Sequence, residues 1–299
     1  IYTMAELKIA LTYEQQIERL KTIHNLTIED DTEALSILKT INYYRLSAYG
    51  IGLKKNDNPE EYLDGISLQS LYKLYSFDSK FKNNLIHIIE QIEIKLRTQI
   101  SNLLALKYGS EGYIDSSNFI SKTTKEGKDI YTTIIENFRT ECIRQKNAPL
   151  VKHHMEKYEG HFPIWVAVEL FTFGNLASLF DIMQPNDRKE IANLYNTEPS
   201  YLGSWILSLV EVRNICAHYS RLYNMPLKQT PFLYKEHRQY RTNINKVFPV
   251  LLVIKRMLNG STLWNEFFNQ IQATFNQYSD VVNLSFIGFP KKWIDILAK

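Results

Sequence analysis

The feature of this sequence that most constrains its fold is a run of apolar residues at helical spacing between Leu68 and Leu106. Apolar residues that recur every three or four positions form one face of an α-helix. The apolar positions are Leu71, Leu74, Phe81, Leu85, Ile88, Ile89, Ile92, Leu96, Ile100 and Leu103. This pattern predicts one long amphipathic helix, bent near Asp78 and ended by the glycines at 109 and 112.

The rest of the chain has the same helical character. Only 11 Gly and 9 Pro occur in 299 residues, and no alternating strand pattern runs longer than four or five residues. Further helices are expected at residues 30–46, 129–157 with a break near Pro149, 163–181, 187–195, from 199 onward, 234–258 and 263–278. The sequence thus predicts an all-α multi-helix bundle of one domain. Its parts are an N-terminal helical part at about 1–115, a core at about 125–260, and a C-terminal helix and tail at 261–299.

The composition excludes several classes of protein. At 44% hydrophobic and 22% charged residues, the chain is typical of a globular protein with an apolar core. Its longest apolar run, residues 247–254, is too short to span a membrane and contains Pro249. No signal peptide is apparent, and Cys142 and Cys216 provide neither a disulfide framework nor a metal quartet. We therefore expect a cytoplasmic protein.

No motif for a metal or an organic cofactor is evident in the sequence. His153, His154 and His161 lack a Cys or carboxylate cluster at ligand spacing. The chain has no glycine-rich phosphate loop, no Gly-x-Ser-x-Gly motif and no catalytic Cys–His pair. We therefore expect no metal and no cofactor.

The strongest candidate for a catalytic site is the hexapeptide Arg-Asn-Ile-Cys-Ala-His that begins at Arg213. Histidine transfers protons near neutral pH, and arginine offers a planar fork of donors for phosphate oxygens. On a helix, Arg213 and His218 are separated by roughly 140° and about 7.5 Å of rise, so they can meet one phosphate only at the helix flank. We predict that both are catalytic, with Asn214 orienting the histidine or binding a phosphate oxygen. A second pair with this spacing, Arg19 and His24, is interpreted as chance.

Each of these residues also has a structural alternative. Arg213 could form an interhelical salt bridge, His218 could be a core histidine bonded to a backbone carbonyl, and Asn214 could be a surface residue. Glu169 follows three apolar residues in a stretch predicted to be mid-helix, where a carboxylate needs a partner. We expect it to support the site by fixing Arg213 or the tautomer of His218, with a simple structural ion pair as the alternative.

Basic residues gather in the segment that follows the hexapeptide. Residues 213–256 contain nine basic side chains and one acidic side chain, interleaved with aromatic residues. Clustered cations with aromatic rings are typical of surfaces that bind single-stranded RNA, although a solvated basic helix face is the alternative. The predicted RNA-binding residues are Tyr219, Arg221, Tyr223, Arg238 and Arg241.

The Arg-Asn-x-x-x-His pattern, in its apolar setting, resembles the HEPN superfamily of ribonucleases. Residues 41–49, 162–174, 221–224 and 288–293 resemble, in the same order, one branch of it, the Abi-like proteins (AbiD/AbiF type) of phage defence by abortive infection. The resemblance implies a HEPN-like core at about 125–260, a homodimer, and a composite site in which Arg213 and His218 of two chains face each other. It also implies products with a 2′,3′-cyclic phosphate and a 5′-hydroxyl.

The leading hypothesis from the sequence is therefore a metal-independent endoribonuclease that acts as a phage-defence toxin, with RNA as its substrate. The alternative is a non-catalytic RNA-binding protein that uses residues 213–256 to hold a structured small RNA, for example a regulatory RNA that restrains it. A module for protein interaction alone would leave the clustering of basic residues unexplained.

Overall fold

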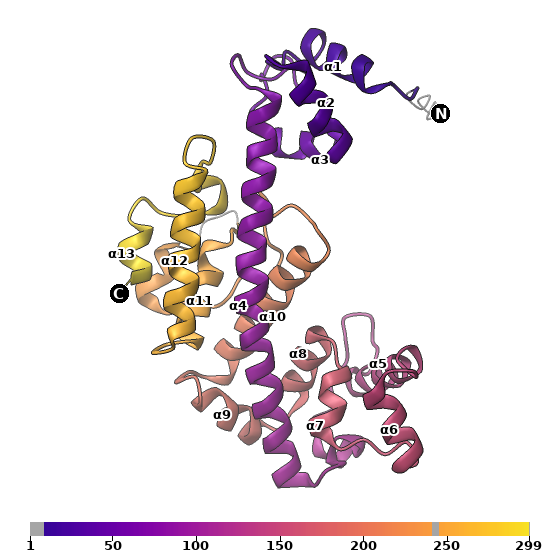
Figure 1. Cartoon of the computed structure of the whole chain (residues 1–299). Helices are drawn as coiled ribbons and strands as arrows, with labels where there is room; N and C mark the ends of the chain where they lie inside the picture. Colours follow the sequence, from indigo (N-terminus) through magenta and orange to yellow (C-terminus); the bar gives the residue numbers. More distant parts are fainter. Residues whose placement is uncertain (1–8, 241–244, 299) are drawn as a thin grey trace.

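The computed structural model describes residues 9–240 and 245–298, and it is organised around one long helix (Figure 1). This helix, α4 (Leu68–Tyr108), has 41 residues and is about 62 Å long. Ser67 caps its first turn by accepting the backbone N–H of Ser70, and Gly109 ends it with a φ of 83° that favours glycine. The long helix predicted over residues 68–106 is confirmed, and it continues through Asp78.

Three short helices pack around the N-terminal end of α4, at the top of Figure 1. They are α1 (Tyr13–Thr22), α2 (Asp31–Thr40) and α3 (Tyr43–Ser47). Together with the start of α4 they bury one apolar cluster, which includes Leu20 and Leu46. The single helix predicted over residues 30–46 is wrong, because the chain is extended at Ile41. A new helix, α3, begins after Asn42, whose side chain caps it by accepting the N–H of Tyr44.

The remaining helices share a larger apolar core with α4. Their bounds are α5 (Ile130–Arg144), α6 (Pro149–Lys157), α7 (Ile164–Ala167), α8 (Phe173–Ile182), α9 (Pro185–Asn193), α10 (Pro199–Ala217), α11 (Phe248–Met257), α12 (Thr262–Gln277) and α13 (Trp293–Ala298). Most of them, α7 to α12, pack along the rest of α4, and α5 packs on α8. Figure 1 shows α5 to α9 around the C-terminal half of α4, and α11 to α13 grouped beside its middle. The described residues form isolated β-bridges but no strand, so the predicted all-α fold is confirmed.

The helix predicted over residues 163–181 is wrong, because the chain is broken between α7 and α8. Val168–Leu170 forms a 3-10 turn, and the Thr172 side chain then caps the start of α8. At the break, the backbone carbonyls of Val168 and Phe171 both accept hydrogen bonds from Arg97 of α4, and that of Val168 also accepts the N–H of Phe171. A buried arginine thus satisfies carbonyls that a continuous helix would have paired internally.

Three other predicted boundaries can be compared with the structure. The break near Pro149 is confirmed, because Pro149 opens α6. The helix predicted over 234–258 begins only at Phe248, and residues 235–240 form a 3-10 turn instead. The C-terminal tail contains the 3-10 turn Leu284–Ile287 and the short helix α13. Within the described part of the chain, every helix is too short or too polar to cross a membrane.

Candidate active site

The hexapeptide lies at the C-terminal end of α10. This helix buries one side, which includes Trp205, Leu209 and Val212. Its solvent-facing side carries Ser200, Leu207 and Asn214, which are spaced seven residues apart, so that each lies about 20° around the helix from the one before it. His218 follows Asn214 by four residues, about 40° around the helix, and is also exposed. Asn214 and His218 therefore share one exposed face, as their proposed partnership requires.

Arg213 lies on the flank of α10, where it faces α4. Its side chain is 37% exposed, and its Nε lies 3.7 Å from Oε2 of Glu93. At that distance the two groups form an ion pair but not a hydrogen bond. No other ion pair or hydrogen bond of this guanidinium is found among the described residues. Glu93 thus orients Arg213 from one side and leaves its two terminal amino groups available to a phosphate.

Glu93 is itself part of a buried chain of charges. Its other carboxylate oxygen pairs with Arg97, and Arg97 donates to the carbonyls at the break between α7 and α8. A buried carboxylate between two arginines is held in one position by both of them. Glu93 is not among the residues predicted from the sequence, although Glu93 and Arg97, four apart within the apolar pattern of α4, form the kind of pair that indicates a buried ion pair.

Glu169 does not occupy the position expected from the sequence. It is exposed in the 3-10 turn between α7 and α8, while its neighbours Val168 and Leu170 are buried. The turn changes the direction in which the side chain points, so the mid-helix environment inferred for Glu169 is wrong. The buried carboxylate beside Arg213 is Glu93.

His218 is the last residue of the helical spiral, and the chain reverses directly after it. The N–H of Ser220 bonds to the carbonyl of Ile215, and that of Tyr219 bonds to the carbonyl of Cys216. This double hydrogen bond is a Schellman motif, whose left-handed position usually carries glycine. Here Tyr219 occupies it with a φ of 55° and a side chain that is 75% exposed. The strained position holds an aromatic ring in solvent beside His218.

Cations from the N-terminal half of the chain hold the carbonyls at this reversal. Arg45 of α3 donates to the carbonyl of Tyr219 at 2.7 Å, and Lys82 of α4 donates to that of Ser220 at 2.8 Å. Positive charge beside the free carbonyls of a helix C-terminus is stabilising. Residues distant in sequence therefore fix the backbone on which His218 is carried.

Asp78 of α4 fixes the next part of the chain. Its fully buried carboxylate accepts the N–H groups of Leu222 and Tyr223, and it pairs with Lys82 at 3.1 Å. It also accepts a hydrogen bond from the phenol hydroxyl of Tyr49 at 2.7 Å. Burial and this carboxylate together raise the pKa of Tyr49, which keeps the phenol a neutral donor. One acidic side chain thus anchors the segment after α10.

Cys216, inside the hexapeptide, is not a reactive thiol. It faces the core, and burial raises its pKa to about 12. The thiolate is the nucleophilic form of cysteine, and almost none of it exists near neutral pH at such a pKa. The proton-transfer group that remains in the hexapeptide is His218. Among the described residues, no group of three or more His, Cys, Asp and Glu is arranged to hold a metal.

Two of the predicted RNA-binding residues contact other parts of the protein through their side chains. Tyr223 is only 2% exposed, packs edge-on against Phe77, and accepts the N–H of Asn283 through its hydroxyl. Its assignment as a base-stacking residue is therefore wrong. Arg221 is half-buried and donates to the carbonyl of Tyr223, and burial lowers its pKa. Both residues shape the segment that Asp78 anchors.

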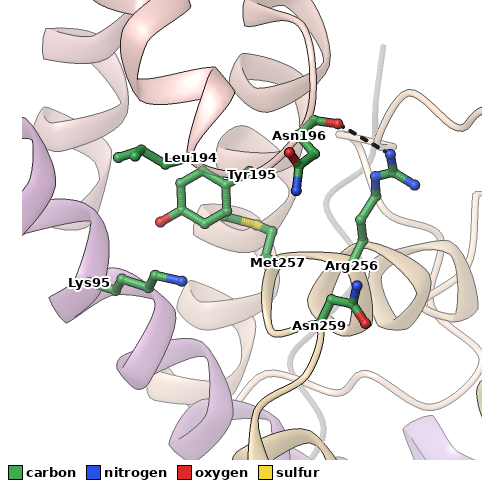
Figure 2. A pocket seen from close by; sticks show the side chains of 7 residues that line it. All are labelled: Lys95, Leu194, Tyr195, Asn196, Arg256, Met257 and Asn259. Atoms are coloured by element: carbon green, nitrogen blue, oxygen red, sulfur yellow. Dashed lines mark hydrogen bonds between the residues drawn. The ribbon is translucent and has the colours of Figure 1, made fainter.

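The other cations of residues 213–256 do not form one continuous track. Lys246 is buried and donates to the side chain of Asn224. Arg256 lies in a separate pocket with Lys95, where it bonds to the carbonyl of Asn196 (Figure 2). Arg238 is exposed and stays a predicted RNA contact. The prediction for Arg241 lies outside the described residues.

Tyr219 offers a test that separates strain from function. In Tyr219→Gly, we expect the free energy of unfolding to be unchanged or higher by up to about 1 kcal/mol, because glycine adopts a positive φ without strain. RNA binding should weaken by about 1–3 kcal/mol if the exposed ring stacks on a base. Urea denaturation and fluorescence anisotropy measure the two effects. Unchanged RNA affinity would rule out the stacking role.

Comparison with known proteins gives the chain a family. The sequence model of the family described as Abi-like protein matches residues 36–224. No curated protein and no solved structure matches the chain. The matched region extends from α2 to the segment after α10, so it includes Arg45, Asp78 and Glu93 as well as Arg213 and His218. The chain belongs to the Abi-like protein family.

Proposed function

We propose that this protein is a metal-independent endoribonuclease of the HEPN type that acts in the cytoplasm as an abortive-infection toxin. The observation that carries the proposal is the arrangement at the end of α10. Asn214 and His218 share its exposed face, and Arg213 is oriented on its flank by Glu93. Membership of the Abi-like family supports a role in abortive infection.

The proposed reaction is an attack of the RNA 2′-hydroxyl on the adjacent phosphate. A base removes the 2′-hydroxyl proton while the bond from phosphorus to the 5′-oxygen breaks, and an acid gives a proton to that oxygen. The products are a 2′,3′-cyclic phosphate and a 5′-hydroxyl. Arg213 would stabilise the negative charge that develops on the phosphorane oxygens.

The base and the acid must lie on opposite sides of the phosphorus, whereas one chain offers a single suitable histidine. We therefore propose a two-fold dimer in which His218 of one chain is the base and His218 of the partner subunit is the acid. The exposed position of His218 at a helix end is compatible with such a facing pair. Sedimentation tests this arrangement, because a protein that is monomeric while it cleaves RNA would contradict it.

Arg213→Lys tests whether the geometry of the guanidinium matters. Lysine keeps the positive charge but replaces a planar fork by a point charge. We expect RNA cleavage to fall by about 10–100-fold, because part of the stabilisation of the phosphorane is lost. The fold should be preserved, since Arg213 is partly exposed. Full cleavage activity in Arg213→Lys would mean that charge alone suffices.

Glu93→Gln tests whether the orientation of Arg213 matters. Removing its charge in Glu93→Gln leaves Arg213 without its ionic partner, so Arg213 should lose orientation although its own chemistry is unchanged. The kcat for RNA should fall more than the affinity for RNA does. If Glu93→Gln lowers the free energy of unfolding but leaves kcat unchanged, the role of Glu93 is purely structural.

A further inference from the structure

A cavity opens on the same face of α10 as His218, nearer the start of that helix. It has a volume of about 400 Å³ and lies between α8, α9, α10 and the chain that follows α10. From α10 it is lined by Ser200, Gly203, Ser204 and Leu207. Ser200 and Leu207 belong to the exposed face that carries Asn214. From Ser204 to His218 the helix rises about 21 Å, a distance that a few nucleotides of single strand can bridge.

Arg188 of α9 lines this cavity and has an unusual environment. Its guanidinium stacks on Phe180 at 5.3 Å, and no ion pair or hydrogen bond of the guanidinium is found among the described residues. Its Nε is buried and has no hydrogen-bond partner. A buried donor without an acceptor is costly, and a native protein rarely keeps one unless something else satisfies it. The arginine is therefore arranged to receive an acceptor that enters the cavity.

The cavity offers further donors and little free negative charge. The Ser204 hydroxyl accepts the N–H of Phe232 at 2.8 Å, which leaves its own proton to donate. Asp181 is the carboxylate in the lining, and it is paired with Lys122 at 2.6 Å. Glu211, between the cavity and His218 along α10, accepts two backbone N–H groups. The acceptor that best fits an arginine fork beside serine hydroxyls is a phosphate.

We propose that this cavity binds a phosphate group of the RNA strand whose cleavage we attribute to His218, with Arg188 as its main ligand. This inference rests on the proposed function, because the strand is taken to run along α10 from the cavity to His218. Leu207 and Phe232, which are both partly exposed at the cavity, provide apolar surface for the adjoining base or ribose. The two sites would hold successive parts of one RNA strand.

Arg188→Gln tests the proposal, with Lys189→Gln as the matched control. Lys189 is the next residue of α9, is exposed, and does not line the cavity. Binding is measured with a fluorescent 12-nucleotide RNA whose 2′-hydroxyls are methylated, so that it cannot be cleaved. Arg188→Gln should bind at least about tenfold more weakly, the effect of losing one charge-assisted contact. Its log–log salt dependence should be shallower by about 0.7, whereas Lys189→Gln should change affinity by less than about threefold.

Folding and ligand source are controlled in the same experiment. Arg188→Gln removes an unsatisfied buried donor, so without RNA its unfolding temperature should not fall. Adenosine monophosphate should compete with the 12-mer only weakly. Wild-type affinity in Arg188→Gln would overturn the proposal, and equal affinities for adenosine monophosphate and the 12-mer would identify a free nucleotide as the occupant instead of a strand.

Parallel cleavage assays keep this inference separate from the proposed function. RNA binding that depends on Arg188, without cleavage by the wild type, supports the phosphate site and contradicts the nuclease. Cleavage by the wild type with normal binding by Arg188→Gln contradicts the phosphate site alone.

Discussion

Replacing His218 with alanine should reduce RNA cleavage by about 10²–10⁴-fold, the usual effect of losing general acid–base catalysis. In a two-fold composite site the loss should lie toward the upper end, because one substitution removes both the base and the acid. The fold should be intact, since the side chain is exposed at the end of α10. RNA affinity should change little, because the proposed role of His218 is chemical. Single-turnover cleavage and anisotropy measure these effects.

His24→Ala is the matched control for this prediction. His24 stands five residues after an arginine, as His218 does, but its ring bonds to the carbonyl of Glu60 among the N-terminal helices. We expect His24→Ala to cleave RNA at nearly the wild-type rate. Retained cleavage in a folded His218→Ala protein would refute the assignment of His218, and loss of cleavage in His24→Ala would reveal a second site.

The largest effect on stability is expected for Asp78→Ala, at about 3–5 kcal/mol of unfolding free energy. The substitution leaves buried Lys82 without its carboxylate and removes the acceptor from the N–H groups of Leu222 and Tyr223. It also leaves the buried phenol of Tyr49 without its partner. Because this network holds the chain after His218, cleavage should fall as well. Urea denaturation gives the free energy.

Asp280→Ala is the matched control for Asp78→Ala. Asp280 forms an ion pair of similar length with Lys73, also of α4, but both side chains are about half exposed. Solvent screening makes such surface pairs contribute little, so we expect a far smaller change in stability. Equal effects of the two substitutions would contradict the role assigned to the buried network.

The sequence predicts the helices of this protein well because helical spacing is a local property. The long apolar pattern of α4 and the position of the hexapeptide on a helix can both be seen in the sequence. The break between α7 and α8 cannot be seen there, because it depends on Arg97, some 70 residues earlier, which donates to the carbonyls of Val168 and Phe171. The outward position of Glu169 follows from that same break.

The contacts around the candidate site likewise could not be predicted from the sequence. Composition shows that residues 213–256 are rich in cations and aromatic rings, but it does not show which of them are buried. Tyr223 is buried because Asp78 and Lys82 draw the chain after α10 onto α4. Glu93 reaches Arg213 only when two helices, more than 100 residues apart in sequence, are packed together. These contacts depend on tertiary packing, which periodicity does not specify.

The central claim is tested most directly by incubating the pure wild-type protein with labelled RNA in the presence of EDTA and determining the ends of the products. We expect cleavage without divalent metal ions, with a 2′,3′-cyclic phosphate on one product and a 5′-hydroxyl on the other, and no cleavage products with His218→Ala. RNA that is bound tightly but stays intact would contradict the account and favour a non-catalytic RNA-binding protein. Products with a 3′-hydroxyl and a 5′-phosphate would contradict it as well, because attack by the 2′-hydroxyl cannot form them.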